Sequence, residues 1–328
     1  MTKTKEWDTF VKEFFLVIKI EDQSLLSNLC GANDQYLDII SQVTGDRIFS
    51  YGNEIIIESS EDNREPIYRL LFDQLKSIAK SPIQIDRPLI ESIIASIKEG
   101  TRLKKTLFID QALTITPTKK VFPRTINQSQ YLMALNKFDL VFGVGPAGTG
   151  KTFLAVAYAL NQILKKEKRK LLLTRPVVEA GESLGFLPGD LLQKINPYLK
   201  PVYDIMDYLI GGEKVAQLEE QRIIEVAPLA YMRGRSLNDS IIILDEAQNT
   251  TKTQMKMFLT RLGEGSKAII TGDLSQIDLP HRDKSGLLHA LSLLKDIDGI
   301  YYSEFSTDDV IRSGLVKKII KAYENEGI

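Results

Sequence analysis

The residues best suited to chemistry stand in one glycine-rich run: Gly145, Pro146, Ala147, Gly148, Thr149, Gly150, Lys151 and Thr152. An apolar run, 140–144, precedes it, and residues 153–164 follow with apolar side chains at helical spacing. Between a strand and a helix, such glycines let the backbone curl so that several N–H groups point at phosphate oxygens. The pattern G-x-x-x-x-G-K-T predicts a nucleotide site in which Lys151 reaches the β- and γ-phosphates and Thr152 places its hydroxyl on Mg²⁺.

Two adjacent acids follow another apolar run. Residues 241–244 predict a buried strand, and Asp245 and Glu246 come directly after it. Gln248 and Asn249 complete a D-E-A-Q-N sequence. We expect Asp245 to hold Mg²⁺ through its water shell, and Glu246 to orient or deprotonate an attacking water. Because the pair comes about 90 residues after the glycine-rich run, in an alternating pattern of strands and helices, it predicts hydrolysis of the nucleotide.

Glutamines near two other strands extend the predicted site. Residues 272–276 (G-D-L-S-Q) resemble motif III of superfamily 1 helicases, in which the glutamine, here Gln276, senses the γ-phosphate. Upstream of the first core strand, Gln128 is our candidate for reading adenine and Gln130 is the alternative. A planar amide both donates to and accepts from one adenine edge, and superfamily 1 helicases carry an adenine-reading glutamine at this place.

Four arginines stand at places from which a side chain reaches phosphate. Arg175 ends the second core strand, Arg233 and Arg235 lie in a glycine-containing loop after the third, and Arg312 begins the last helix. The planar guanidinium pairs well with phosphate oxygens, so we expect contacts to the γ-phosphate or to a nucleic-acid backbone. We expect Arg312 to act within its own subunit. For Arg233 and Arg235, contact with an RNA backbone or pairing with local acids is the alternative to a contact with the nucleotide.

From residue 126 onward, short apolar strands alternate with helical stretches. The candidate strands are Leu140–Val144, Leu171–Thr174, Ile223–Val226, Ile241–Leu244, Ala268–Thr271 and Ile300–Glu304. This alternation predicts a parallel sheet with helices on both faces, in which ligands bind at the carboxyl ends of the strands. The glycine-rich run, the acid pair and Gln276 each follow such an end. Residues 126–328 are therefore expected to form one α/β domain.

Residues 1–100 predict a separate, small α+β domain. The expected order is a strand (10–20), two helices around the turn 31–34, a hairpin and a third helix, and it resembles a KH-type nucleic-acid module. In such modules a G-x-x-G turn clamps the sugar-phosphate backbone. Here Asp34 replaces the second glycine and would repel phosphate. A small packing or oligomerisation domain is therefore the equally weighted alternative.

Residues 101–125 form the expected domain boundary, a basic linker or strand region. One acid, Asp110, stands against six basic residues: Arg102, Lys104, Lys105, Lys119, Lys120 and Arg124. The stretch is either a solvated linker or a patch that contacts a nucleic-acid backbone.

Composition limits the class of protein. The length of 328 residues predicts two domains, and 43% hydrophobic with 26% charged residues is typical of a globular protein. The net charge of −1 gives no global attraction to nucleic acid or membrane. No signal peptide or membrane span is expected. One cysteine and two histidines predict neither a disulfide framework nor a structural zinc site. We expect a cytoplasmic protein.

Together these sequences closely resemble the PhoH-like (phosphate-starvation-inducible) ATPases. The resemblance rests on the glycine-rich run and on residues 174–190 (T-R-P-V-V-E-A-G-E-S-L-G-F-L-P-G-D), 232–239 (M-R-G-R-S-L-N-D), 244–249 (L-D-E-A-Q-N) and 271–280 (T-G-D-L-S-Q-I-D-L-P). It implies a RecA-like P-loop core of the superfamily 1 type and binding and hydrolysis of ATP with Mg²⁺ in the cytoplasm. It also implies a role in RNA metabolism, sometimes beside a ribosome-maturing endoribonuclease.

Superfamily 1 motors close ATP between two cores, and this chain has one, with about 16 residues after Arg312. A neighbouring subunit would then supply an arginine, so we expect a head-to-tail homo-oligomer with Arg233 and Arg235 as donors. The leading prediction is an RNA-associated ATPase that remodels RNA or moves along it. The alternative is a nucleotide-controlled adaptor that recruits a nuclease and turns over slowly. A small-molecule kinase is a third class, which the D-E-A-Q-N and G-D-x-x-Q sequences disfavour.

Overall fold

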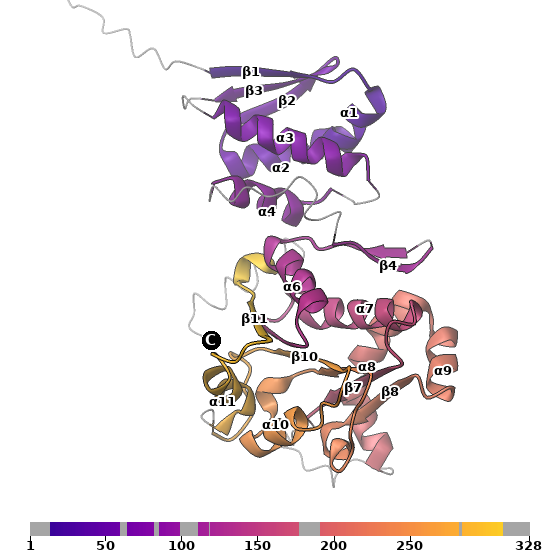
Figure 1. Ribbon diagram of the computed structural model, residues 1–328. Coiled ribbons are helices and arrows are strands. Elements are labelled where there is room, and N and C mark those ends of the chain that lie inside the picture. Colours follow the sequence, from indigo (N-terminus) through magenta and orange to yellow (C-terminus); the bar gives the residue numbers. More distant parts are fainter. Residues whose placement is uncertain are drawn as a thin grey trace, which may run out of the picture. The chain divides into compact units, whose positions relative to one another are not determined.

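Six short apolar segments pair into one parallel sheet in the computed structural model (Figure 1). Its strands are β6 (Leu140–Val144), β7 (Lys170–Arg175), β8 (Ile224–Pro228), β9 (Ser240–Leu244), β10 (Lys267–Gly272) and β11 (Ile300–Glu304). Their order across the sheet is β11-β6-β10-β9-β7-β8, and every pairing is parallel. The predicted α/β P-loop fold is confirmed, because each predicted strand coincides with one of these.

The structure describes residues 14–59, 64–81, 85–98, 111–117, 119–176, 191–281 and 284–310. The chain divides into two compact units, residues 1–110 with 124–126 and residues 111–123 with 127–328. The parallel sheet belongs to the second unit. Among the described residues, no helix combines the length and the apolar character needed to cross a membrane.

The parallel sheet has a core on each face, because successive side chains of a strand point to opposite faces. Ile241 and Ile243 of β9 join one cluster, whereas Ile242 and Leu244 join the other. The first cluster includes side chains of α6 (Ile126–Lys137), α7 (Lys151–Leu164), α8 (Leu191–Ile210) and α9 (Gly212–Glu220). The second includes side chains of α10 (Lys252–Leu259) and α11 (Gly286–Leu293). Helices therefore cover both faces, as predicted.

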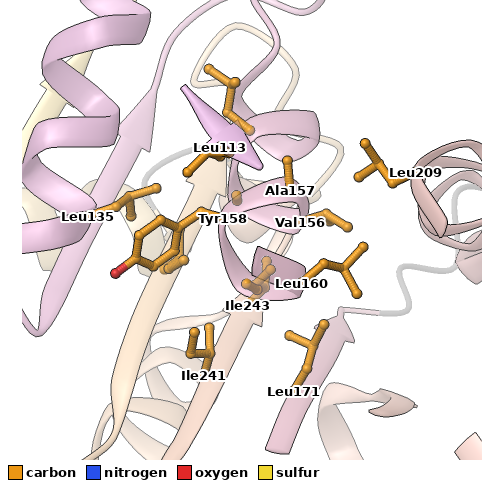
Figure 2. Packing of buried hydrophobic residues seen from close by; sticks show 14 of the residues in the cluster. Leu113, Leu135, Val156, Ala157, Tyr158, Leu160, Leu171, Leu209, Ile241 and Ile243 are labelled. Carbon is orange, nitrogen blue, oxygen red and sulfur yellow. The ribbon is translucent and has the colours of Figure 1, made fainter. Parts of the chain in front are cut away.

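Helix α7 is held along its whole length. Figure 2 shows its side chains, among them Val156 and Leu160, in one cluster with Leu171 and Ile243 of the sheet. Ten of its 14 residues are buried, including the first, Lys151. This packing fixes the start of the helix, and with it the end of the glycine-rich loop.

A two-stranded hairpin extends this unit on the N-terminal side. Strands β4 (Leu113–Thr116) and β5 (Lys119–Val121) pair antiparallel. Their buried side chains, those of Leu113, Ile115 and Val121, join the core of α7. The buried Asn161 of α7 donates a hydrogen bond to the carbonyl of Thr114 at 2.7 Å. Part of the basic 101–125 region is therefore folded structure.

The other unit is a small antiparallel sheet with helices. Strands β1 (Phe14–Lys19), β2 (Arg47–Tyr51) and β3 (Glu54–Ser59) lie in the order β1-β3-β2. The helices are α1 (Gln23–Cys30), α2 (Gln35–Thr44), α3 (Glu65–Ala79) and α4 (Arg87–Lys98). The predicted succession of strand, two helices, hairpin and helix is confirmed.

The turn between α1 and α2 carries the aspartate that departs from the G-x-x-G pattern. Gly31 has φ +72°, and a Cβ there would lie 2.7 Å from the ring of Tyr36. Asp34 has φ +58°, and its carboxylate accepts a hydrogen bond from the hydroxyl of Ser50 on β2 at 2.7 Å. Asp34 thus ties the turn to the sheet.

A buried ion pair holds the end of α2 to α3. Asp46 is 8% exposed and accepts a hydrogen bond from Arg64 Nη1 at 2.7 Å. The hydroxyl of Tyr68 also donates to it, and Arg64 Nη1 donates to the carbonyl of Thr44 at 2.8 Å. Burial, followed by the bond to Asp46, raises the pKa of Tyr68 to about 12.

Candidate nucleotide-binding site

The glycine-rich loop joins β6 to α7 at the carboxyl edge of the sheet. Gly145 and Gly150 have φ of +150° and +82°, a backbone region that favours glycine. A Cβ on Gly145 would lie 2.3 Å from the carbonyl oxygen of Phe305, and one on Gly150 would lie 3.1 Å from Gln128 Nε2. Both positions therefore need glycine, Gly145 for space as well as for conformation.

Lys151 points back into this loop. Its ammonium donates to the carbonyls of Gly145 and Pro146, both at 2.7 Å, and lies 3.2 Å from Thr149 Oγ1. Burial lowers the pKa of Lys151, and three nearby carboxylates oppose this effect, those of Asp273, Asp245 and Glu246. The loop thus surrounds a buried lysine in a strongly acidic setting.

Asp245 has hydrogen-bond donors on both carboxylate oxygens. Its Oδ1 accepts from Thr152 Oγ1 at 2.7 Å and from Thr271 Oγ1 at 2.6 Å, while its Oδ2 accepts from Arg175 Nε at 2.7 Å. The residue is 2% exposed. The two predicted Mg²⁺ ligands, Thr152 and Asp245, are therefore in direct contact, although 93 residues separate them in the chain.

Arg175 contacts the acid pair directly. Its Nη2 lies 2.5 Å from Asp245 Oδ2 and 3.5 Å from Glu246 Oε1, and its side chain is 14% exposed. Its Nη1 donates to the carbonyl of Tyr198 on α8 at 2.8 Å. From the sequence we expected Arg175 to contact a phosphate or a nucleic-acid backbone, whereas in the structure it contacts the two acids. The pairing of the strands explains this difference. Because β7 lies beside β9, with Thr174 opposite Leu244, the residues that follow these two meet.

Glu246 is the more exposed of the two acids. It has φ +55°, and its side chain is 43% exposed. Its Oε2 accepts from Gln248 Nε2 at 2.7 Å. The Oε1 of Gln248 accepts from the N–H of Asp273 at 3.0 Å, and Asp273 Oδ2 accepts from the N–H of Ala147 at 2.9 Å. A chain of hydrogen bonds thus connects Glu246 with the glycine-rich loop.

A pocket of about 240 Å³ opens between these groups. The glycine-rich loop, the acid pair, Asp273, Gln276 and Phe153 all contribute to its lining. The structure therefore brings together the loop, Lys151, Thr152, Asp245, Glu246 and Gln276. Sequence reasoning gave no role at this site to Asp273, Gln248 or Thr271, and it expected Arg175 to contact a phosphate or a nucleic-acid backbone and not the acid pair.

The two candidate adenine readers occupy different environments. Gln128 is 2% exposed, and its Nε2 donates to the carbonyl of Thr149 at 2.9 Å. Gln130 is exposed on α6. The Gln128 amide therefore supports the glycine-rich loop, and its recognition of adenine stays a prediction.

The predicted arginines also differ in their surroundings. Arg235 makes two hydrogen bonds to Glu225, at 2.6 and 2.8 Å, and this arginine holds the pKa of Glu225 below its usual range. Arg233 is exposed. Arg312 lies outside the described residues. Lys104 and Lys105 of the basic stretch do so as well.

The donor set fits a magnesium nucleotide. Mg²⁺ keeps several waters and binds one or two carboxylates together with substrate phosphates, and the contacting oxygens of Thr152 and Asp245 in the pocket match that preference. Among the described residues, no cluster of three or more His, Cys, Asp or Glu side chains forms an all-protein metal site. Backbone N–H groups at the start of α7 and the ammonium of Lys151 are the groups that would bind the phosphates.

The fold, the loop and the acid pair define a nucleotide-binding protein of the P-loop class. Residues 120–324 match the family model described as "PhoH-like protein", so the chain belongs to the PhoH-like family. It is 45% identical over 309 residues to a PhoH-like protein of Bacillus subtilis, covering 94% of this chain and 96% of that one. It is 55% identical over 299 residues to a PhoH-like protein of Mycobacterium tuberculosis, covering 91% and 85%.

A solved structure, the Pif1 helicase from Candida albicans, matches with a TM-score of 0.32 and 12% identity, over 61% of this chain and 42% of that one.

Proposed function

We propose that this protein binds ATP with Mg²⁺ and hydrolyses it. The contact between Thr152 and Asp245 at 2.7 Å, inside the pocket that the glycine-rich loop lines, carries the proposal. Glu246 lines the same pocket, and a second acid beside the metal ligand supports hydrolysis rather than binding alone.

Each residue has a separate role in this proposal. Lys151 and the loop N–H groups bind the β- and γ-phosphates, while Thr152 and Asp245 hold the metal. Bound Mg²⁺ neutralises charge that develops on the phosphates. Glu246 orients or deprotonates the attacking water. Gln276 senses the γ-phosphate, Gln128 contributes to adenine selectivity, and Arg312 contacts the γ-phosphate from the same core.

Measurement of phosphate release from ATP by the Lys151→Ala variant tests the ATPase proposal. Since the ammonium is the charge partner of the phosphates in a buried site, its loss should lower turnover by at least about 10²–10³-fold and weaken nucleotide binding. Lys165→Ala is the matched control, because Lys165 is exposed at the other end of the same helix. Wild-type turnover in Lys151→Ala would reject the assignment.

We further propose that the ATPase acts on RNA in the cytoplasm, with an endoribonuclease as its partner. The exposed basic residue Lys120 on the β4–β5 hairpin supports RNA contact. Phosphate release with and without single-stranded RNA separates the candidate functions. Stimulation supports RNA remodelling or movement along RNA, and slow turnover that RNA does not change supports a nuclease-recruiting adaptor. A requirement for a metabolite acceptor would support a kinase.

We also propose a head-to-tail homo-oligomer in which a neighbour contributes an arginine. Arg233 is the favoured donor, because Arg235 is paired with Glu225 in its own chain. Arg233→Ala subunits are mixed with Lys151→Ala subunits, each inactive alone. Recovery of part of the ATPase rate in mixed oligomers supports the shared site, and full activity in a strictly monomeric preparation rejects it.

A further inference from the structure

Every guanidinium nitrogen of Arg175 has an acceptor. Nε and Nη2 hold Asp245 Oδ2 at 2.7 and 2.5 Å, and Nη2 also lies 3.5 Å from Glu246 Oε1. Nη1 donates to the carbonyl of Tyr198 at 2.8 Å. The guanidinium of this residue, at the end of β7, therefore contacts both acids after β9 and the main chain of helix α8.

The two acids differ in how much they depend on this arginine. Asp245 is also fixed through Thr152 and Thr271 on its other oxygen. Glu246 has a side chain that is 43% exposed. Within the part of the chain that the structure describes, Gln248 donates a hydrogen bond to its Oε2 and Arg175 forms an ion pair with its Oε1. A carboxylate that activates water must be held in one geometry, and a misplacement of about 1 Å costs about 10²-fold in rate.

Arg175 contacts the two acids and does not line the pocket. The described residues that line the pocket include Asp245 and Glu246 and do not include Arg175. Arg175 also donates a hydrogen bond to the main-chain carbonyl of Tyr198 on α8. The arginine therefore links that helix to the acid pair.

We propose that Arg175 is a positioning residue that holds Glu246 beside Asp245 in the geometry for hydrolysis, with helix α8 as its support. The inference rests on the proposed ATPase function. The proposed role depends on the planar shape of the guanidinium. A single charged group does not reach Asp245, Glu246 and the carbonyl of Tyr198 at the same time.

Arg175→Lys separates shape from charge. Lysine keeps the positive charge, but its single ammonium does not reproduce the planar fork. We expect kcat to fall by about 10–100-fold, while the dissociation constant for ATP stays within about 3-fold because the glycine-rich loop is untouched. Arg169→Lys is the control, since Arg169 precedes the same strand and makes an exposed ion pair with Asp239 at 2.9 Å. It should leave both values unchanged.

A double-mutant cycle with Glu246→Gln identifies the residue through which Arg175 acts. If Arg175 works through Glu246, then Arg175→Lys/Glu246→Gln hydrolyses ATP as fast as Glu246→Gln alone, within about 2-fold. Losses that multiply would overturn the proposal, as would an unimpaired Arg175→Lys or a parallel loss of ATP affinity.

Arg175→Ala gives an independent readout where folding allows. Guanidinium ion should restore part of the kcat of Arg175→Ala and none of that of Arg175→Ala/Glu246→Gln, and equal effects on both would overturn the proposal. If the wild type itself hydrolyses no ATP, the proposed function fails first. If the wild type is active and Arg175→Lys matches it, only the positioning role fails.

Discussion

Two buried aspartates, one in each unit, are held in similar ways. Asp46 accepts hydrogen bonds from Arg64 and the hydroxyl of Tyr68. Asp245 accepts from Arg175 and from two threonine hydroxyls. The side chains of both aspartates are almost fully buried, at 6% and 3% exposed. By burial and by the chemistry of their donors, the two sites are nearly the same.

The difference lies in where the donors come from and what stands next to the aspartate. The donors of Asp46 are 18 and 22 residues away in the chain and fix α3 to the end of α2. The donors of Asp245 come from β7, α7 and β10, and the aspartate lines a pocket beside Glu246 and Lys151. A buried ion pair is thus no sign of a reaction. The pocket and the second acid separate the two cases.

The largest effect should come from removing the second acid, which sharpens this contrast. Glu246→Gln should bind ATP and Mg²⁺ and hydrolyse about 10²–10⁴ times more slowly, because the base that activates water is lost. Asp245→Ala should instead lose Mg²⁺-dependent binding. Nucleotide binding titrated against Mg²⁺ distinguishes the two variants, and identical curves would refute the division of roles.

The Asp46 site should respond in stability and not in rate. Arg64→Ala leaves a buried carboxylate without its cation and should destabilise the first unit by about 3 kcal/mol, with kcat unchanged. Hydrogen exchange of the β1–β3 amides in the full chain measures this loss. Arg47→Ala is the control, because the Arg47 side chain is 75% exposed in its pair with Glu58 and should cost under about 1 kcal/mol. If kcat falls while the amides of strands β1, β2 and β3 keep their protection from exchange, the Asp46 site is not limited to a role in stability.

A smaller effect is expected from the amide that supports the phosphate loop. Gln128→Ala removes the donor to the Thr149 carbonyl and should weaken both ATP and GTP binding by about 10-fold. If the amide also reads adenine, ATP loses more than GTP, which is the outcome we expect. Competition between the two nucleotides measures the ratio, with Gln130→Ala as control. Equal losses would limit Gln128 to the loop.

The smallest effect concerns the hairpin. Lys119 donates to the carbonyl of Tyr208 and lies 3.7 Å from the centre of the Tyr208 ring, whereas Lys120 is exposed. Lys120→Glu should therefore reduce the slope of log affinity for RNA against log salt by about 1. The exposed Lys295 gives the control variant Lys295→Glu. An unchanged slope would make the hairpin a purely structural addition to the core.

The local sequence was sufficient to predict the strands of the parallel sheet, the glycine-rich loop and the acid pair. Strand β9 is an apolar run that Asp245 and Glu246 follow directly, so its position and its chemistry are read together. The contact of Arg175 with Asp245 depends on β7 lying beside β9 although β8 intervenes in the chain. No local pattern contains that order. The same holds for Gln248, whose amide bridges Glu246 and Asp273 across two strand ends.

The order of the strands has a consequence for protein synthesis. Strand β6, which leads into the glycine-rich loop, is paired with β10 and β11, and both are translated long after it. Gly145 also donates to the carbonyl of Gly272 at 3.2 Å. Since chains emerge from the ribosome N-terminus first, a nascent chain that ends before residue 300 has β6 without one of its neighbours. Nucleotide binding should therefore begin only late in translation.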